Sequence, residues 1–137
     1  MKTFIVTLAV VALLLVFPLQ NVLDIVNGYR INRFDDIVHR SAQMARLDGY
    51  FTETNIDELK SNIIGNFPGI GEDDIVLNLE TNLKVRTDVF DERELIHYEI
   101  SVPIKKVIAA GLFLGIPESE NMVVYTKKGY VLSEVLP

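Results

Sequence analysis

The sequence predicts an α+β protein in which one long N-terminal helix packs on a small antiparallel sheet. Residues 3–23 carry no charge, residues 22–45 place apolar side chains at helical spacing, and segments after residue 74 alternate apolar and polar side chains. The expected divisions are residues 1–26 as a transmembrane helix, residues 27–49 as its amphipathic continuation, and residues 50–137 as a globular α+β head.

The uncharged N-terminal segment predicts a retained membrane anchor. Its 21 residues would span about 31 Å as a helix, close to the roughly 30 Å hydrocarbon core of a bilayer. A cleaved signal peptide is the alternative, but no small-x-small cleavage spacing follows Phe17. Pro18 lacks an N–H, so we expect it to kink or locally melt the helix.

The helix is expected to continue beyond the membrane as an amphipathic segment. Asp48-Gly49 should end it, because glycine is the usual left-handed cap. Residues 3–48 would then form one rod of about 69 Å. The sheet needs a helix to cover its apolar face. The residues expected to do so are Phe34, Ile37, Val38, Ala42 and Ala45.

The head is expected to combine one short helix with three or four strands. Asn55 and Glu58 resemble a capping box that opens a helix over residues 56–64. Strands are expected at residues 74–82 and 95–104, with Pro103 ending the second strand or placing it on an edge. Residues 105–114 suit either a helix or a strand. Residues 122–135 predict a hairpin that turns at Lys127-Lys128-Gly129.

Charge and composition exclude several classes of function. Residues 50–137 contain 15 acids and 8 bases, within a chain of net charge −6. An acidic domain repels phosphate backbones, so nucleic-acid binding is not expected. The chain has no cysteine, which excludes disulfides, thiolate metal sites and cysteine nucleophiles.

Candidate chemical sites are weak, and we expect neither an enzyme nor a bound cofactor or metal. Asp35, Asp36 and His39 could ligate a metal, but the chain has only two histidines. The acidic stretch 72–74 lacks the spacing of a known calcium loop and is better explained as a solvated loop. The acidic residues of 88–94 are expected in an exposed turn and need no catalytic explanation. His97 should face water, and no nucleophile or phosphate-loop motif is present.

The helix segment 36–49 and the C-terminal segment 125–135 make the chain resemble the type IV pilin superfamily, closest to minor-pilin-like proteins of tight-adherence systems and their mobile-element relatives in Firmicutes. The resemblance implies a subunit of a surface filament that assembles through its apolar helix. Prepilins also carry a processing-site glycine and a glutamate five residues into the mature helix. No glycine precedes Gly28 here, and position 5 is Ile5.

The resemblance leads to a hypothesis about subunit contacts. Without an early glutamate, Lys2 or the N-terminal amine would pair with Asp24 of a neighbour, about 33 Å along the helix. Gln20, Asn21 and Asp24 mark the membrane interface or bond to neighbouring helices. The residues expected in subunit contacts are Lys2, Asp24, Phe4, Leu8, Val11 and Leu15.

These expectations define the partners and the location. The partners are copies of this chain or related pilin-like subunits, with membrane lipid before assembly. Lys and Arg near the helix ends favour a cytoplasmic head, whereas the short leader favours an extracytoplasmic one. We expect the latter, followed by an extracellular filament. A single-span binding component of an envelope or secretion complex is the main alternative, and a secreted domain is the third.

Overall fold

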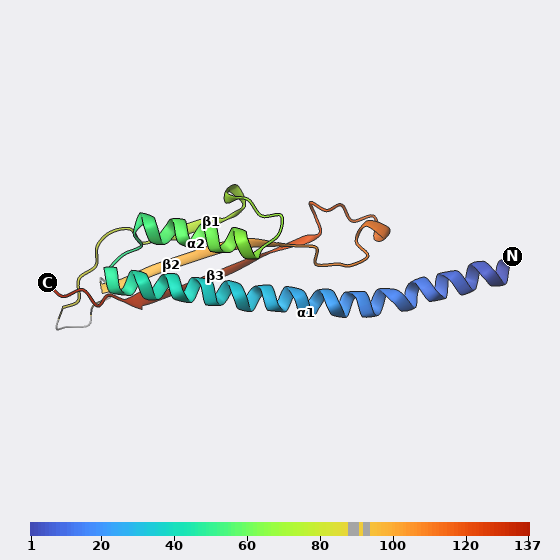
Figure 1. Ribbon diagram of the computed structural model, residues 1–137, viewed down its shortest axis with the longest axis horizontal. Helices are drawn as coiled ribbons and strands as arrows, with labels where there is room; N and C mark the ends of the chain where they lie inside the picture. The colour runs from blue at the N-terminus through green and yellow to red at the C-terminus, as the bar shows by residue number, and fades with distance from the viewer. Residues whose placement is uncertain (88–90, 92–93) are drawn as a thin grey trace. The chain divides into compact units, whose positions relative to one another are not determined.

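The computed structural model describes residues 1–87, 91 and 94–137 (Figure 1). It confirms the α+β class, with a long N-terminal helix and a small three-stranded sheet. The chain divides into two compact units, one of Met1–Tyr29 with Ile104–Val123 and one of Arg30–Pro103 with Val124–Pro137. Residues 104–123, expected in the head, therefore group with the first part of the helix.

The helix α1 spans Lys2–Asp48. Residues on both sides of Pro18 remain helical, so the expected local melting does not occur, and a kink at Pro18 stays a prediction. The helix ends as the sequence indicates. Gly49 has φ 83°, and its N–H donates to the Ala45 carbonyl at 2.7 Å.

Most of a three-stranded sheet belongs to the second unit. Its strands are β1 (Val76–Leu79), β2 (Leu95–Lys105) and β3 (Met122–Leu132), in the order β1-β2-β3. β1 pairs antiparallel with β2, with Leu77 opposite Ile100. The backbone N–H of Ser133 donates to the Glu94 carbonyl, and that of Lys106 donates to the Asn121 carbonyl. β3 therefore also runs antiparallel to β2.

One face of this sheet forms the core. Along β2, Ile96, Ile100 and Val102 are buried, whereas His97 and Glu99 are exposed, as the alternation of the sequence predicts. The C-terminal part of α1 and the helix α2 (Glu53–Asn66) cover this face together (Figure 1). The five α1 residues expected there are all buried: Phe34, Ile37, Val38, Ala42 and Ala45.

Pro103 lies inside the central strand, so the expectation that it ends the strand or marks an edge strand was wrong. The Glu80 N–H donates to the His97 carbonyl, so the backbone groups of odd-numbered β2 residues face β1. Position 103 therefore faces residue 74, before β1 begins at Val76. The missing N–H leaves no bond to β1 unmade.

The expected hairpin at residues 122–135 was also wrong, because β3 runs unbroken through residues 127–129. The register places Gly129 opposite Tyr98. A Cβ at Gly129 would lie 2.6 Å from the Tyr98 hydroxyl oxygen. The glycine therefore makes room for an aromatic ring within the sheet instead of forming a turn.

The helix α2 begins earlier than the capping pattern indicates. Thr52 is the N-cap, and its side chain accepts from the Asn55 N–H. Asn55 is buried instead. Its side-chain oxygen Oδ1 accepts from the Ser41 hydroxyl at 2.7 Å, and its side-chain Nδ2 donates to the Ser41 backbone carbonyl at 2.9 Å. These bonds join α2 to α1 within the core.

Phe34 provides a test of this packing. Its ring is fully buried and meets the rings of Phe67 and Tyr125 edge to face, at centroid distances of 6.1 and 5.7 Å. Phe34→Ala should lower the free energy of unfolding by about 3–5 kcal/mol because it leaves a cavity. Denaturant unfolding of the full chain in mild detergent, followed by near-ultraviolet circular dichroism, measures this change.

The matched control is Leu47→Ala on the same helix, where the side chain is 64% exposed. This substitution should change stability by less than about 0.5 kcal/mol. Equal effects of the two substitutions would contradict the docking of α1 on the sheet.

Candidate functional site

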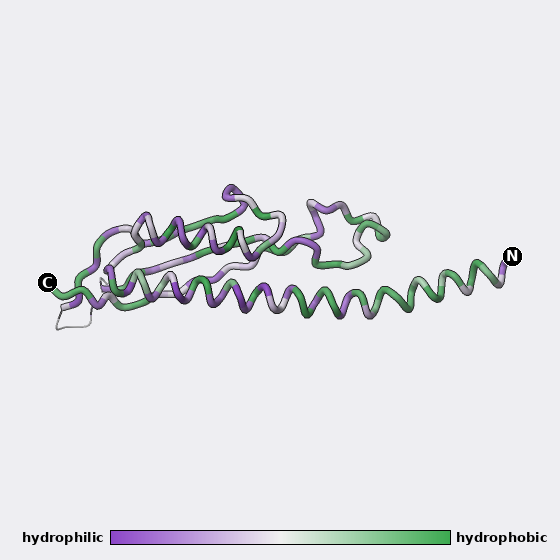
Figure 2. The backbone as a smooth tube through the Cα atoms, in the orientation of Figure 1, coloured by the Kyte–Doolittle hydropathy of each residue, from purple (hydrophilic) through white to green (hydrophobic). Residues whose placement is uncertain are grey.

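The first half of α1 exposes apolar side chains on every side. Of residues 4–22, all of which are described, thirteen are large, apolar and exposed. They include the four apolar residues expected in subunit contacts, Phe4, Leu8, Val11 and Leu15. Figure 2 shows this stretch as almost continuously hydrophobic. By length and composition, α1 can cross a membrane.

The size of this exposed surface decides what it can do. At about 1.5–3 kcal/mol for each large side chain, removing thirteen from water yields on the order of 20–40 kcal/mol. A typical domain is stable by only about 5–15 kcal/mol. An apolar surface of this size is therefore compatible with burial in a membrane.

The polar residues near the end of this stretch bond within the chain. The Gln20 amide donates to Asp24 Oδ1 at 2.8 Å and to the Val107 carbonyl at 2.9 Å, and Gln20 Oε1 accepts from the Ala109 N–H at 3.0 Å. Asp24 and Lys2 are both exposed. The structure therefore leaves the hypothesis of a contact between neighbouring subunits untested.

The segment that Gln20 holds is the loop of residues 105–121, called here the 105–121 loop. The sequence of residues 105–114 suits either a helix or a strand. In the structure, Leu112–Leu114 form a short 3-10 helix, η3. The Asn121 side chain organises the loop. Its Oδ1 accepts from Val107 and Ile108 N–H groups, and its amide donates to the Ile108 carbonyl at 2.8 Å.

Lys106 marks where the loop leaves the sheet. It has φ 62°, a conformation that costs a residue with a side chain free energy. Its N–H donates to the Asn121 carbonyl, and its own carbonyl accepts from the Asn27 amide at 3.3 Å. Two asparagines thus fix the bend. Nothing in the local sequence signals that Asn27 and Gln20 would bond to positions about eighty residues away.

An apolar groove lies between α1 and this loop, within the first unit. Leu19, Val22 and Val26 line it from the helix, and Ile108 and Phe113 line it from the loop. Gly111 allows the loop backbone to pass close to the Asn121 side chain, because a Cβ at position 111 would lie 2.6 Å from the Asn121 amide nitrogen. The groove continues the exposed apolar surface of the helix.

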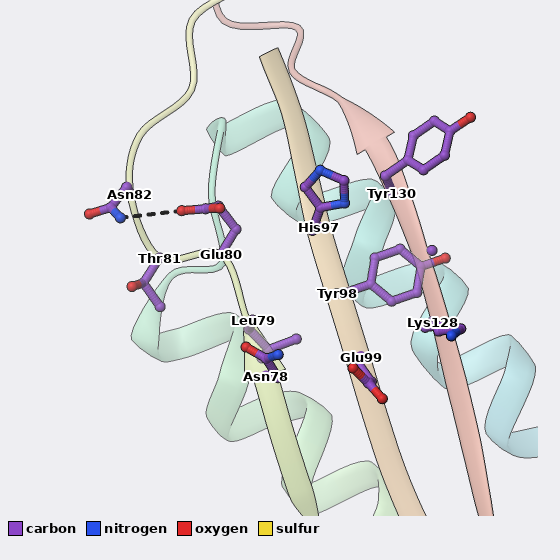
Figure 3. Close-up of a pocket in the computed structure, with 11 residues that line it drawn as sticks. Asn78, Leu79, Glu80, Thr81, Asn82, His97, Tyr98, Glu99, Lys128 and Tyr130 are labelled. Atoms are coloured by element: carbon purple, nitrogen blue, oxygen red, sulfur yellow. Dashed lines mark hydrogen bonds between the residues drawn. The ribbon is translucent and has the colours of Figure 1, made fainter. Parts of the chain in front are cut away.

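A second, polar hollow lies on the outer face of the sheet (Figure 3). His97 and Tyr130 lie beside each other there, with ring centroids 6.1 Å apart, and Glu99 and Lys128 lie two positions away from them along β2 and β3. Asn82 donates to Glu80 at 3.2 Å. His97 and Glu99 are on the solvent-facing side of β2, as the sequence predicts for His97.

Of the acidic residues considered as possible metal ligands, Asp35 and Asp74 form contacts within the fold. Asp35 contacts Lys127 at 3.5 Å and the Tyr125 hydroxyl at 3.3 Å, whereas Asp36 and His39 are exposed. Asp74 caps a short 3-10 turn by accepting from the Gly71 N–H at 3.0 Å. Among the described residues, no three His, Cys, Asp or Glu side chains gather to hold a metal.

The acidic turn expected at residues 88–94 lies largely outside the described residues. Within it, only Asp91 and Glu94 are described. Glu94 is buried, and its carboxylate accepts from the Thr87 N–H at 3.0 Å.

Comparison with known proteins adds no relative. No protein-family model matches the sequence, and no curated protein and no solved structure shows a match.

The role given to Asn121 can be measured. Asn121→Ala should speed hydrogen exchange at the Val107 and Ile108 amides roughly tenfold or more, because each lost bond is worth about 1–3 kcal/mol. The neighbouring exposed residue supplies the control, Glu120→Ala. Exchange by mass spectrometry on the full chain in detergent measures both, and equal rates in the two variants would contradict this account of the loop.

Proposed function

We propose that this protein is a structural subunit of a type IV pilin-like surface filament, assembling through its apolar N-terminal helix. The observation that carries the proposal is the change of surroundings along α1. Every large apolar residue from Phe4 to Val22 is exposed, whereas Phe34, Val38 and Ala45 are almost fully buried. One helix thus combines a surface for other helices with a surface for its own sheet.

The continuity of this helix supports a filament over a simple tether. A membrane anchor needs only about 20 residues, and a flexible linker can follow it. Here α1 runs for 47 residues without a break. In a filament, such a helix brings apolar halves of many copies together while each copy keeps its folded sheet.

The charges at the ends of the apolar stretch suit a staggered assembly. Lys2 and Asp24 lie 22 positions apart, which is about 33 Å along a helix. An unpaired buried charge costs about 3–5 kcal/mol. A neighbour displaced by this distance would place its Asp24 level with Lys2 or the N-terminal amine and neutralise both charges.

The proposed partners follow from this assembly. They are further copies of the chain or related pilin-like subunits, with lipid around the helix before assembly. The head would lie outside the cytoplasmic membrane and then on an extracellular filament. We propose no catalytic activity, no cofactor and no nucleic-acid partner.

A single-span binding component of an envelope or secretion complex is the second candidate. One observation favours it. The 105–121 loop lies against Leu19, Val22 and Val26 of α1, and so occupies helix surface that a bundle of subunits would also use. In this case the head would bind a partner protein while α1 stayed in lipid.

Electron microscopy separates the two candidates. Material sheared from cells that make an epitope-tagged form of the full chain should contain filaments that bind an antibody to the tag. Cells whose membranes hold the tagged chain but shed no labelled filaments would contradict the filament proposal and leave the single-span candidate.

The staggered contact has its own test in Asp24→Asn. This change removes the charge but keeps the oxygen that accepts from Gln20, so filaments should be lost or shortened while insertion and head stability remain. Asp48→Asn, at the exposed end of α1, removes an equal charge and should assemble normally. Normal filaments from Asp24→Asn would rule out the contact.

A further inference from the structure

The tip of the 105–121 loop exposes three consecutive large apolar side chains. Leu112 is 73% exposed, Phe113 97% and Leu114 68%. They form η3, bounded by Gly111 and by Gly115 in the left-handed conformation at φ 78°. Soluble surfaces usually expose apolar residues singly, whereas a contiguous group indicates a binding or membrane surface.

The loop contacts α1 at a defined level. The Gln20 side chain hydrogen-bonds to the Val107 carbonyl and the Ala109 N–H, and the Asn27 side chain hydrogen-bonds to the Lys106 carbonyl. Gln20 lies 18 positions after Lys2, or about 27 Å along a helix, close to the roughly 30 Å hydrocarbon core. With Lys2 at one boundary of the core, the loop meets the helix at the other boundary.

We propose that the loop tip inserts into the lipid bilayer, at the boundary between headgroups and acyl chains, as a second membrane contact beside α1. Phe113 would enter deepest because it is the most exposed. The tip belongs to the same compact unit as the apolar helix and lines a groove with it, so one apolar surface runs from helix to tip. The inference rests on the proposed placement of α1 in a membrane and requires no filament.

Lipid fits this tip better than a second copy of the chain. A stable protein interface buries about 800 Å² on each partner. Even at about 150–250 Å² for each side chain, three would bury less than that. The legs of the loop carry Lys105, Lys106, Glu118 and Glu120, so their charges balance. Insertion should therefore need apolar burial alone, without anionic lipid.

The chain contains no tryptophan, so Phe113→Trp introduces a single fluorescent probe where the exposed side chain leaves room. The full-length variant is reconstituted in phosphatidylcholine vesicles, with bromines placed at different depths of the acyl chains. We expect blue-shifted emission and loss of about half the fluorescence to shallow bromines, with less to deep ones.

Two further variants make the result decisive. Phe17→Trp lies in the apolar part of α1, and Tyr130→Trp lies on the outer face of the sheet, where Tyr130 is 63% exposed. Quenching at positions 17 and 113 but not at 130 supports the inference. Quenching at 17 alone overturns it and leaves the membrane placement of α1 intact. Lack of quenching at 17 contradicts the placement of α1 and the inference with it.

The remaining outcomes also decide. Equal quenching at 113 and 130 would mean that the whole chain adsorbs to lipid, which removes the specific role of the tip. Blue-shifted emission at 113 that bromolipids do not quench, and that depends on the protein-to-lipid ratio, would show a contact with another copy and overturn the inference. Replacing both Leu112 and Leu114 by Gln should make the Trp probe shallower and its quenching weaker.

Discussion

Water is an unfavourable environment for the first half of α1, and this constrains where the chain can reside. The large apolar residues from Phe4 to Val22 are all exposed in the described part of the chain. The free energy available from burying them exceeds the stability of a typical small domain. Lipid and a bundle of like helices would both satisfy the constraint, and under the proposed function the helix meets lipid before it meets other copies.

Two polar residues, Gln20 and Asn27, lie where α1 passes from its exposed apolar half to the half that packs on the sheet. Gln20 and Asn27 give hydrogen-bond partners to three backbone groups of the 105–121 loop, the carbonyls of Lys106 and Val107 and the N–H of Ala109. Further along the same helix, Phe34 and Val38 pack against the sheet. Successive segments of α1 therefore expose apolar side chains, bond to the backbone of the 105–121 loop and pack in a protein core.

Local patterns in the sequence predict the parts of the fold that depend on residues close together in the chain. The helix and its end at Gly49 follow from periodicity and a glycine cap, and the buried face of β2 follows from alternation around Ile100. Contacts between distant residues explain the failures. Gly129 looks like a turn residue until Tyr98 is placed opposite it, and Pro103 looks like a strand breaker until the end of β1 is known. The bonds of Gln20 to Val107 and Ala109 have no local signal at all.

Cysteine accessibility along α1 reports whether its first half is in contact with water, and single cysteines can be introduced because the chain has none of its own. Single cysteines at Leu8, Val11 and Leu14 are compared with one at Leu47, which is similarly exposed but lies on the sheet-packing part of α1. A water-soluble, membrane-impermeant maleimide is applied to the full chain in cell membranes opened to both sides. We expect rapid labelling at position 47 and almost none at the other three, because lipid or neighbouring helices would cover them. Equal labelling rates at all four positions would contradict this expectation.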